Sequence, residues 1–466
     1  MKKKVEKITA VLILFLIVFA YINNAFYIKY SDGIYSLNVF YELDKNTVDV
    51  LFLGSSHAFE NYNTSVLWDE HGIASYVLGG SEQPMWNTYY YLKEALKTQS
   101  PELIVLEGYG VVYSDEYMSD YSMYKNCLGI KSLSNRIGNI NASAGYRDRL
   151  TLLFPLFSFH DRYRELSYED FMKDKGDVFY DSWKGFANHF DKEQFSSLDY
   201  KNVGEVSDLS IKTEKYYRKI IELSKDNNIP LIIIVNPYPL VKESEIKKIN
   251  KAKIIAQEYE VDFYDYSLSE KLFGIDYSED AADQFHLNYK GNVKLTRAIG
   301  DMLYSKYNIT NRKGDEKYIS WDENSSILNR TVANYENTVN SFEDLNTNNY
   351  INDYSVFFFV NDEYKSEEHL ENYLKTQDIY IDNKIINHVW YKNYSSGEIK
   401  EYEYCMNDAF IRKIIDKDLI KADYSKDKDY FTKTDEGVNV VVFDNYLDKV
   451  VDNYGIIYKD GFIIIR

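Results

Sequence analysis

From Thr47 onward, short apolar runs alternate with stretches in which apolar residues recur at helical spacing. This alternation predicts βαβ units, in which parallel strands form one sheet and helices cover its faces. The predicted strands are residues 49–53, 74–78, 102–106, 230–235 and 261–264. The predicted helices are residues 63–70, 84–97, 211–224 and 290–307, each placed where a crossover is needed or after the last strand. We therefore expect an open α/β sheet of five parallel strands, and we take its order to be 2-1-3-4-5.

Residues 113–206 interrupt this alternation after the third predicted strand, and they are dense in aromatic side chains. An insertion at this point is expected to lie above the carboxyl edge of the sheet. It can be interpreted as a lid or substrate platform, or as a helical elaboration that only packs on the sheet.

The character of the chain changes after a polar linker at residues 308–316. Residues 356–360, 438–443 and 455–465 are rich in β-forming side chains, and Asp460-Gly461 inside the last run is a hairpin signal. We predict a separate β-rich α+β domain over residues 316–466.

The N-terminus predicts a membrane anchor. Met1-Lys2-Lys3-Lys4 precedes residues 8–28, which carry no charged side chain and are long enough to cross the hydrocarbon core. The lysines place the N-terminus in the cytoplasm, so residues 1–30 are predicted as a single-pass anchor in the cell membrane and residues 31–315 as an extracellular domain. A cleaved signal peptide is the alternative, but residues 20–25 lack an A-x-A-like site.

Composition narrows the range of partners. The chain has 466 residues, 45% of them hydrophobic, which suits at least two folded domains. A net charge of −19 argues against nucleic acid as a partner, because binding to phosphates requires clustered Lys and Arg. The two cysteines, Cys127 and Cys405, form no metal or redox motif, and their pairing is left open. We expect neither a metal nor a cofactor.

Two short segments carry the candidate chemistry. Gly54-Ser55-Ser56 follows the first predicted strand, and Asp283-Gln284-Phe285-His286 precedes the last helix. Ligand sites of open α/β sheets form outside the carboxyl ends of the strands. A serine hydroxyl becomes a nucleophile when a base takes its proton, and that base needs an acceptor to orient it. Ser56, His286 and Asp283 are therefore a predicted catalytic triad, and the N–H groups of the turn at Ser56 can contribute to an oxyanion hole.

On these motifs, residues 45–310 resemble the SGNH hydrolase superfamily, related to the GDSL lipases. Gly54-Ser55-Ser56 matches its first block, with Ser at the Asp position, and Asp283 to His286 matches its last block. Leu78-Gly79-Gly80-Ser81 looks like the second block, whose glycine N–H donates to the oxyanion; Gly79 is the first choice and Gly80 the alternative. The resemblance implies a flavodoxin-like three-layer sandwich and an acyl-enzyme mechanism on ester bonds.

The third block departs from the family pattern. Where the family has Gly-x-Asn-Asp, this chain has Glu107 followed by Gly108, and an ionised carboxylate cannot donate a hydrogen bond. Asn236, after the fourth strand, is a candidate replacement on position alone. The same departure occurs in a membrane-anchored, extracytoplasmic branch that resembles proteins of teichoic acid D-alanylation and exopolysaccharide O-acetylation. That resemblance implies a cell-envelope polysaccharide or teichoic acid as substrate and a membrane-bound O-acyltransferase as partner.

Residues 354–363 and 437–452 are weakly similar to the interleukin-like domain first named for an inducer of epithelial-mesenchymal transition. This similarity implies an accessory β fold without catalysis of its own.

Three further residues are candidate substrate contacts: His57 beside the nucleophile, Glu107, and His160 in the insertion. Each also has a structural interpretation, as a helix-start residue, an ion-pair partner and a buried histidine respectively. The leading hypothesis is an extracytoplasmic serine-dependent O-acyltransferase or esterase that acts on acyl groups, acetyl above all, of cell-envelope glycan. The alternative is a non-catalytic glycan-binding protein on a degenerate SGNH scaffold.

Overall fold

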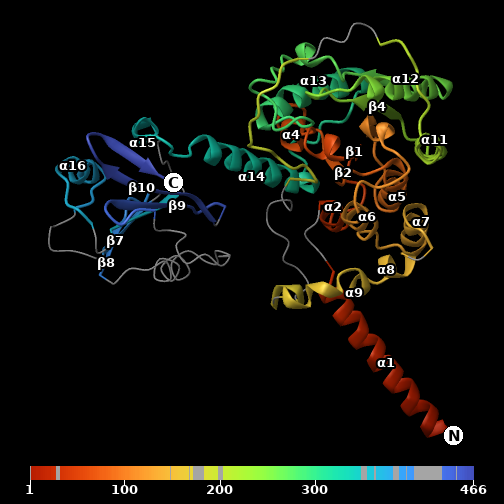
Figure 1. Cartoon of the computed structure of the whole chain (residues 1–466), viewed down its shortest axis with the longest axis horizontal. Helices are drawn as coiled ribbons and strands as arrows, with labels where there is room; N and C mark the ends of the chain where they lie inside the picture. Colours follow the sequence, from red (N-terminus) through yellow and green to blue (C-terminus); the bar gives the residue numbers. More distant parts are fainter. Residues whose placement is uncertain are drawn as a thin grey trace. The chain divides into compact units, whose positions relative to one another are not determined.

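The computed structural model describes residues 2–27, 32–146, 148–166, 168–171, 183–197, 203–347, 354–360, 364–380, 388–394, 396–403, 433–447 and 449–466. The chain folds into two compact units, Met1–Leu328 and Asn329–Arg466 (Figure 1).

A five-stranded parallel sheet forms the centre of the first unit. Its strands are β1 (Val50–Gly54), β2 (Ser75–Gly79), β3 (Leu103–Glu107), β4 (Leu231–Val235) and β5 (Asp262–Asp265). They are ordered β2-β1-β3-β4-β5, and every neighbouring pair is parallel. The predicted fold class and strand order are confirmed. All five predicted runs became strands, displaced by at most one residue at either end.

Helices cover both faces of this sheet. They are α2 (Asp32–Phe40), α3 (Ser56–Phe59), α4 (Thr64–His71), α5 (Met85–Ala95), α11 (Ile211–Asp226), α12 (Glu243–Glu258) and α13 (Tyr289–Tyr307), with short 3-10 turns η1 (Gly108–Val112), η4 (Glu270–Phe273) and η5 (Glu316–Tyr318). The residues expected to begin and end α4 do so in the structure. The Asn63 side chain accepts from the N–H groups of Ser65 and Val66 to begin α4, and Gly72 ends it in the left-handed conformation.

Alternating strand residues divide the core into two layers, because successive side chains of a strand point to opposite faces. Leu51 and Leu53 of β1 join the cluster formed with α2, α5, α11 and α12. Val50 and Phe52 join the cluster formed with α3, α4 and α13. The sheet is thus buried on both faces, so only its edges and the ends of its strands can carry a site.

The insertion after β3 is mainly helical. Its described elements are α6 (Asp120–Cys127), α7 (Leu133–Ser143), α8 (Arg149–Leu153), α9 (Pro155–Ser158), η2 (His160–Arg164) and η3 (Tyr168–Phe171). Cys127 is buried among them, and Cys405 lies outside the described residues. Residues 183–197 then return to the sheet and its helices, where the N–H of Ala187 donates to the carbonyl of Phe59.

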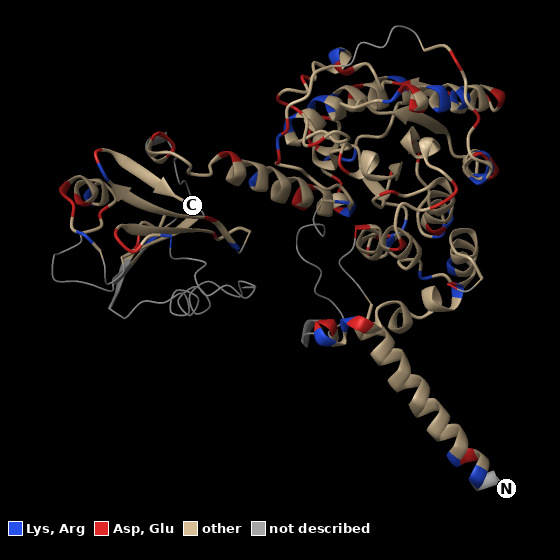
Figure 2. Ribbon diagram, in the orientation of Figure 1, with Lys and Arg blue, Asp and Glu red and all other residues tan. Residues whose placement is uncertain are grey.

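The N-terminal helix α1 (Lys2–Ala25) contains the segment Lys4–Ala25, which is long and apolar enough to cross a membrane. Charged residues occur only near its N-terminus (Figure 2).

The second unit is built on an antiparallel sheet ordered β11-β10-β9-β6-β7-β8. Its elements are α14 (Ile319–Glu336, which begins in the first unit), α15 (Phe342–Thr347), β6 (Tyr354–Val360), α16 (Glu368–Thr376), β7 (His388–Asn393), β8 (Ile399–Glu403), β9 (Val438–Asp444), β10 (Lys449–Tyr458) and β11 (Phe462–Ile465). Asp460 and Gly461 both have positive φ and form the hairpin between the last two strands, as predicted. The predicted α+β character of this region is confirmed.

Candidate active site

The turn after β1 presents Ser56 at the carboxyl edge of the sheet. Ser55 precedes α3, and Ser56 is its first residue, so the N–H groups here have no partner within the helix. Gly54 is required by packing. A Cβ at this position would lie 2.8 Å from the Cβ of Glu107 and 3.0 Å from that of Ala58. The close approach of β1, β3 and α3 therefore demands glycine directly before the two serines.

Ser56, His286 and Asp283 form a continuous hydrogen-bonded chain. Nε2 of His286 lies 2.8 Å from Oγ of Ser56, and Nδ1 lies 2.8 Å from Oδ2 of Asp283. Oδ1 of Asp283 accepts from the backbone N–H groups of Phe285 at 2.7 Å and His286 at 2.9 Å, so the loop holds its own carboxylate in place. With a proton on Nδ1, Nε2 is left to accept from the serine hydroxyl.

The electrostatics keep Asp283 ionised. Partial burial opposes ionisation, but the hydrogen bond and charge of His286, with the two backbone N–H donors, lower the pKa of Asp283 to about 2. A carboxylate in this state can orient the imidazole and stabilise it when it takes up a proton.

A second carboxylate, which we did not predict, lies beside the imidazole. Oε2 of the buried Glu60 is 3.3 Å from Nδ1 of His286 and 3.2 Å from Nε2 of His189. The rings of His189 and His286 are nearly parallel, with centroids 6.2 Å apart. The hydrogen bond to Glu60 raises the pKa of His189, although burial opposes this. Glu60 lies one helical turn after Ser56, a spacing that sequence analysis could have noticed; no local signal marks His189.

His57, next to Ser56 in the chain, packs against the rings of Tyr109 and Tyr238. Its ring stacks on Tyr109 with centroids 3.8 Å apart and meets Tyr238 edge-on at 5.1 Å. Only 2% of the residue is exposed. Burial, and then the neighbouring His286, hold the pKa of His57 well below its usual value, so the ring is neutral. The structure gives His57 a packing position with little surface for a substrate.

Glu107 is fully buried beneath the turn, and both its carboxylate oxygens lie 3.1 Å from the N–H of Tyr109. Burial raises the pKa of Glu107 to about 8, despite backbone hydrogen bonds from Tyr109 and Asn236 that oppose the shift. The side chain is therefore largely protonated at neutral pH, which differs from the ionised carboxylate considered in the sequence analysis.

The Asn236 amide ties the end of β4 to α3. Its Nδ2 donates to the backbone carbonyl of His57 at 2.8 Å, and its Oδ1 accepts from the hydroxyl of Tyr62 at 2.9 Å. The side chain is completely buried. These contacts hold the helix that carries Ser56, and they use one of the two N–H donors of the amide that sequence position had made a candidate oxyanion donor.

Gly79 and Gly80 lie beside this turn, whereas His160 does not. Gly79 pairs with Gly54 in the sheet, and a Cβ there would lie 2.6 Å from the carbonyl oxygen of Gly54. Gly80 follows at the end of β2, against Asn126. His160 is on η2, where its ring lies 3.2 Å from the Phe157 carbonyl and its side chain is 69% exposed.

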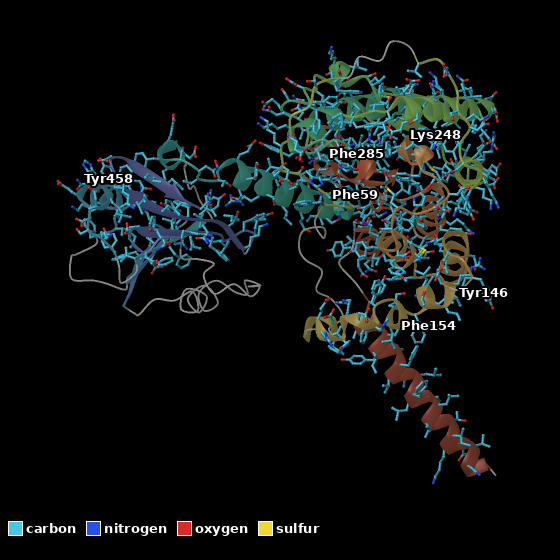
Figure 3. The ribbon with its side chains drawn as sticks, viewed as in Figure 1. Phe59, Tyr146, Phe154, Lys248, Phe285 and Tyr458 are labelled. Carbon is cyan, nitrogen blue, oxygen red and sulfur yellow. The ribbon has the colours of Figure 1, made fainter. Side chains whose placement is uncertain are left out.

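Figure 3 shows Phe154, at the start of α9, far from Phe59 of α3 and from Phe285 of the loop that carries His286. The structure therefore does not bring His160 together with the triad residues. Among the residues that the structure describes, no group of three or more His, Cys, Asp or Glu side chains could hold a metal ion.

Fold and site together define an α/β protein with a hydrogen-bonded Ser, His and Asp at the carboxyl edge of its parallel sheet. No protein-family model matches the chain, and no curated protein matches it. Among solved structures, the chain is similar to a proposed acylhydrolase from Bacteroides fragilis, with 13% identity and a TM-score of 0.30. That similarity covers 58% of this chain and 95% of the other.

Proposed function

We propose that this protein is an extracytoplasmic serine-dependent O-acyltransferase or esterase that acts on acyl groups of cell-envelope glycan. The observation that carries the proposal is the pair of 2.8 Å hydrogen bonds that link Ser56 to His286 and His286 to Asp283. A serine, a base and an orienting carboxylate in this order are the requirements for covalent acyl transfer.

The reaction follows from this geometry in two halves. Oγ of Ser56 attacks the ester carbonyl carbon while Nε2 of His286 takes its proton, and Asp283 stabilises the imidazolium. Collapse of the tetrahedral intermediate breaks the ester bond, and His286 returns the proton to the departing alcohol. A second hydroxyl, from a sugar or from water, then gives its proton to His286 and attacks the acyl carbon; the bond between that carbon and Oγ of Ser56 breaks, and His286 returns the proton to Oγ. N–H groups at the start of α3, with Gly79 beside them, are the proposed oxyanion donors.

The place of action is argued from α1. Its apolar length suits a single-pass anchor, and the lysines at its start favour a cytoplasmic N-terminus. The proposed substrates, a cell-envelope polysaccharide or teichoic acid, and the proposed partner, a membrane-bound O-acyltransferase, rest on the family resemblance of the motifs.

The nucleophile is tested by labelling the full chain with a serine-directed fluorophosphonate. Ser56→Ala should abolish labelling. Ser55→Ala is the matched control, since it removes the adjacent hydroxyl, which is fully buried, and it should still be labelled. Unchanged labelling of Ser56→Ala would show that the nucleophile assignment is wrong.

A non-catalytic glycan-binding protein is the second candidate. The burial of Asn236 favours it, because this side chain was the proposed replacement for the missing third donor and one of its two N–H groups already donates to the His57 carbonyl. Hydrolysis of p-nitrophenyl acetate by the full chain, lost in His286→Ala, supports the enzyme. Absence of hydrolysis and of fluorophosphonate labelling supports the binding protein. Transfer rather than hydrolysis is supported if acyl groups reach an added sugar acceptor faster than water.

A further inference from the structure

The helix α1 leaves the first unit with its apolar surface uncovered. Side chains along its middle are exposed by half or more, for example Leu14 at 61% and Ile17 at 60%. Because such a surface requires an apolar environment, α1 marks where a bilayer would lie relative to the first unit.

The insertion is attached to the C-terminal third of α1, and not only to the folded domain. The ring of Phe19 contacts Phe154 and Phe157, with centroids 5.6 and 6.4 Å apart. Oδ1 of Asn23 accepts from the backbone N–H of Leu156 at 3.0 Å. Figure 3 shows Phe154 beside this end of the helix. These contacts fix α9 at the level of residues 19–23 of α1.

Helix geometry converts this attachment into a depth. Lys7 is the last charged residue before the apolar stretch, and at ~1.5 Å per residue Phe19 lies roughly 18 Å further along the axis. The hydrocarbon core is about 30 Å thick. With Lys7 at its cytoplasmic boundary, Phe19 lies about 12 Å inside the opposite boundary, and a tilt of α1 increases that depth. Phe154 and Phe157 contact Phe19, so they lie within the hydrocarbon too.

Polar residues of the same segment lie where the boundary is expected. Nη1 of Arg162 donates to the carbonyl of Phe26 at 3.0 Å, and Phe26 is roughly 28 Å along the axis from Lys7. Nε of Arg164 donates to the hydroxyl of Tyr163, whose residue is 60% exposed. Arg and Tyr side chains are suited to the headgroup region, where an apolar stem and a polar end are both accommodated.

Three apolar residues of the segment are exposed. Leu150 is 65% exposed, Phe157 49% and Phe154 37%. Solvent-exposed aromatic side chains beside a bare apolar helix indicate one continuous surface for lipid.

We propose that α8, α9 and η2 form a membrane-embedded platform: Leu150, Phe154 and Phe157 enter the acyl region of a phospholipid bilayer, and Arg162, Tyr163 and Arg164 lie among its headgroups. The first unit is thereby held against the membrane at two points, which fixes the height and orientation of Ser56 above the surface. This inference needs α1 to be retained but does not depend on the proposed catalytic activity.

The test uses the full chain in nanodiscs of phosphatidylcholine and phosphatidylglycerol. Cys405 is replaced by Ser, and an NBD fluorophore is attached at Phe157→Cys; the buried Cys127 is protected from labelling. We expect quenching by lipids with doxyl groups on the acyl chain and little quenching by aqueous iodide. Tyr304→Cys on α13 is the matched control, because Tyr304 is 50% exposed on a helix remote from α1 (Figure 1), and it should show the reverse pattern.

Iodide quenching at Phe157 equal to that at Tyr304 would overturn the platform. It would exclude lipid as the occupant of this surface. The mass of the labelled chain shows whether α1 is retained, and a chain that has lost α1 overturns the proposal. In a second variant, Phe154→Lys with Phe157→Lys, a probe at Leu150→Cys should lose its lipid quenching while α1 keeps the chain in the nanodisc. Retained lipid quenching there would contradict the role of α9.

Discussion

Glu60 brings a carboxylate oxygen to 3.3 Å from Nδ1 of His286, the nitrogen that Asp283 already contacts at 2.8 Å. The imidazole thus faces two acidic groups. One comes from its own loop, and the other comes from the helix that carries the proposed nucleophile. The shorter contact is the hydrogen bond, so the two carboxylates are expected to differ in importance.

Replacement of these two acids should therefore have unequal effects. Asp283→Asn should lower kcat/KM by about 10³- to 10⁴-fold, as expected when the orienting carboxylate is lost and the imidazole tautomer is wrong. Glu60→Gln should lower it only about tenfold, or ~1.4 kcal/mol, because its contact with the imidazole is the longer of the two. Steady-state ester hydrolysis from pH 5 to 9 measures both. The exposed Glu42→Gln serves as the control, and equal losses for the two acids would refute this ranking.

Asn236 is expected to act as a structural clamp on α3. Tyr62→Phe removes the donor to Oδ1 of Asn236 and should cost about 1–3 kcal/mol of stability. Tyr277→Phe is the matched control, because its buried hydroxyl has no hydrogen-bond partner among the described residues, and it should be near neutral. Asn236→Ala should lose stability and kcat together. A fall in kcat of about 10²- to 10³-fold at unchanged stability would instead make Asn236 an oxyanion donor.

Because the pKa of Glu107 is raised in the folded state, the free energy of unfolding is expected to fall as pH rises. That pKa is about 8 in the folded state and about 4.3 in an unfolded chain, so between these values the folded state binds more protons than the unfolded one. The contribution is fully present below the unfolded pKa and is lost as pH rises through the folded pKa, at a slope of at most ~1.4 kcal/mol per pH unit. Glu107→Gln removes this dependence. The thermal midpoint is measured in detergent from pH 5 to 9 for both proteins. The midpoint of Glu107→Gln minus that of wild type should increase as pH rises, and a difference that does not change with pH would argue against a buried, protonated Glu107.

Asp444 should stabilise the second unit without affecting the proposed chemistry. Its Oδ2 accepts from Nε of Arg330 at 2.6 Å and from Asn334 at 2.7 Å, and the carboxylate is fully buried. Asp444→Asn removes the charge of the buried carboxylate that pairs with Arg330 and should cost about 3 kcal/mol. Limited proteolysis should then cleave residues 329–466 faster, while ester hydrolysis stays at the wild-type rate. Asp460→Asn is the control, since Asn tolerates the same positive φ. Loss of hydrolysis in Asp444→Asn would mean that the two units are coupled.

Much of the fold was predictable because its signals are local. Apolar runs at residues 49–53 and 102–106 have the length of buried strands, Asn63 and Gly72 delimit a helix through their own turn chemistry, and Asp460-Gly461 makes a hairpin within four residues. Asp283 and His286 also needed no tertiary information to be paired as candidates, since they occupy one loop. By contrast, α12 and α14 were not predicted, and His160 was selected by residue type alone and lies on an exposed turn beside α9.

The sequence by itself therefore determined the strand positions, the parallel α/β class expected of a βαβ chain, the apolar N-terminal helix and the three residues proposed to react. Only the tertiary structure decided that Glu60 and His189 lie beside His286, that the Asn236 side chain bonds to His57 and Tyr62, and that burial raises the pKa of Glu107 to about 8. The physical reason is the same in each case. Contacts between residues far apart in the chain, and the loss of water around a carboxyl group, depend on how the whole domain packs, whereas periodicity and turn chemistry act over a few residues.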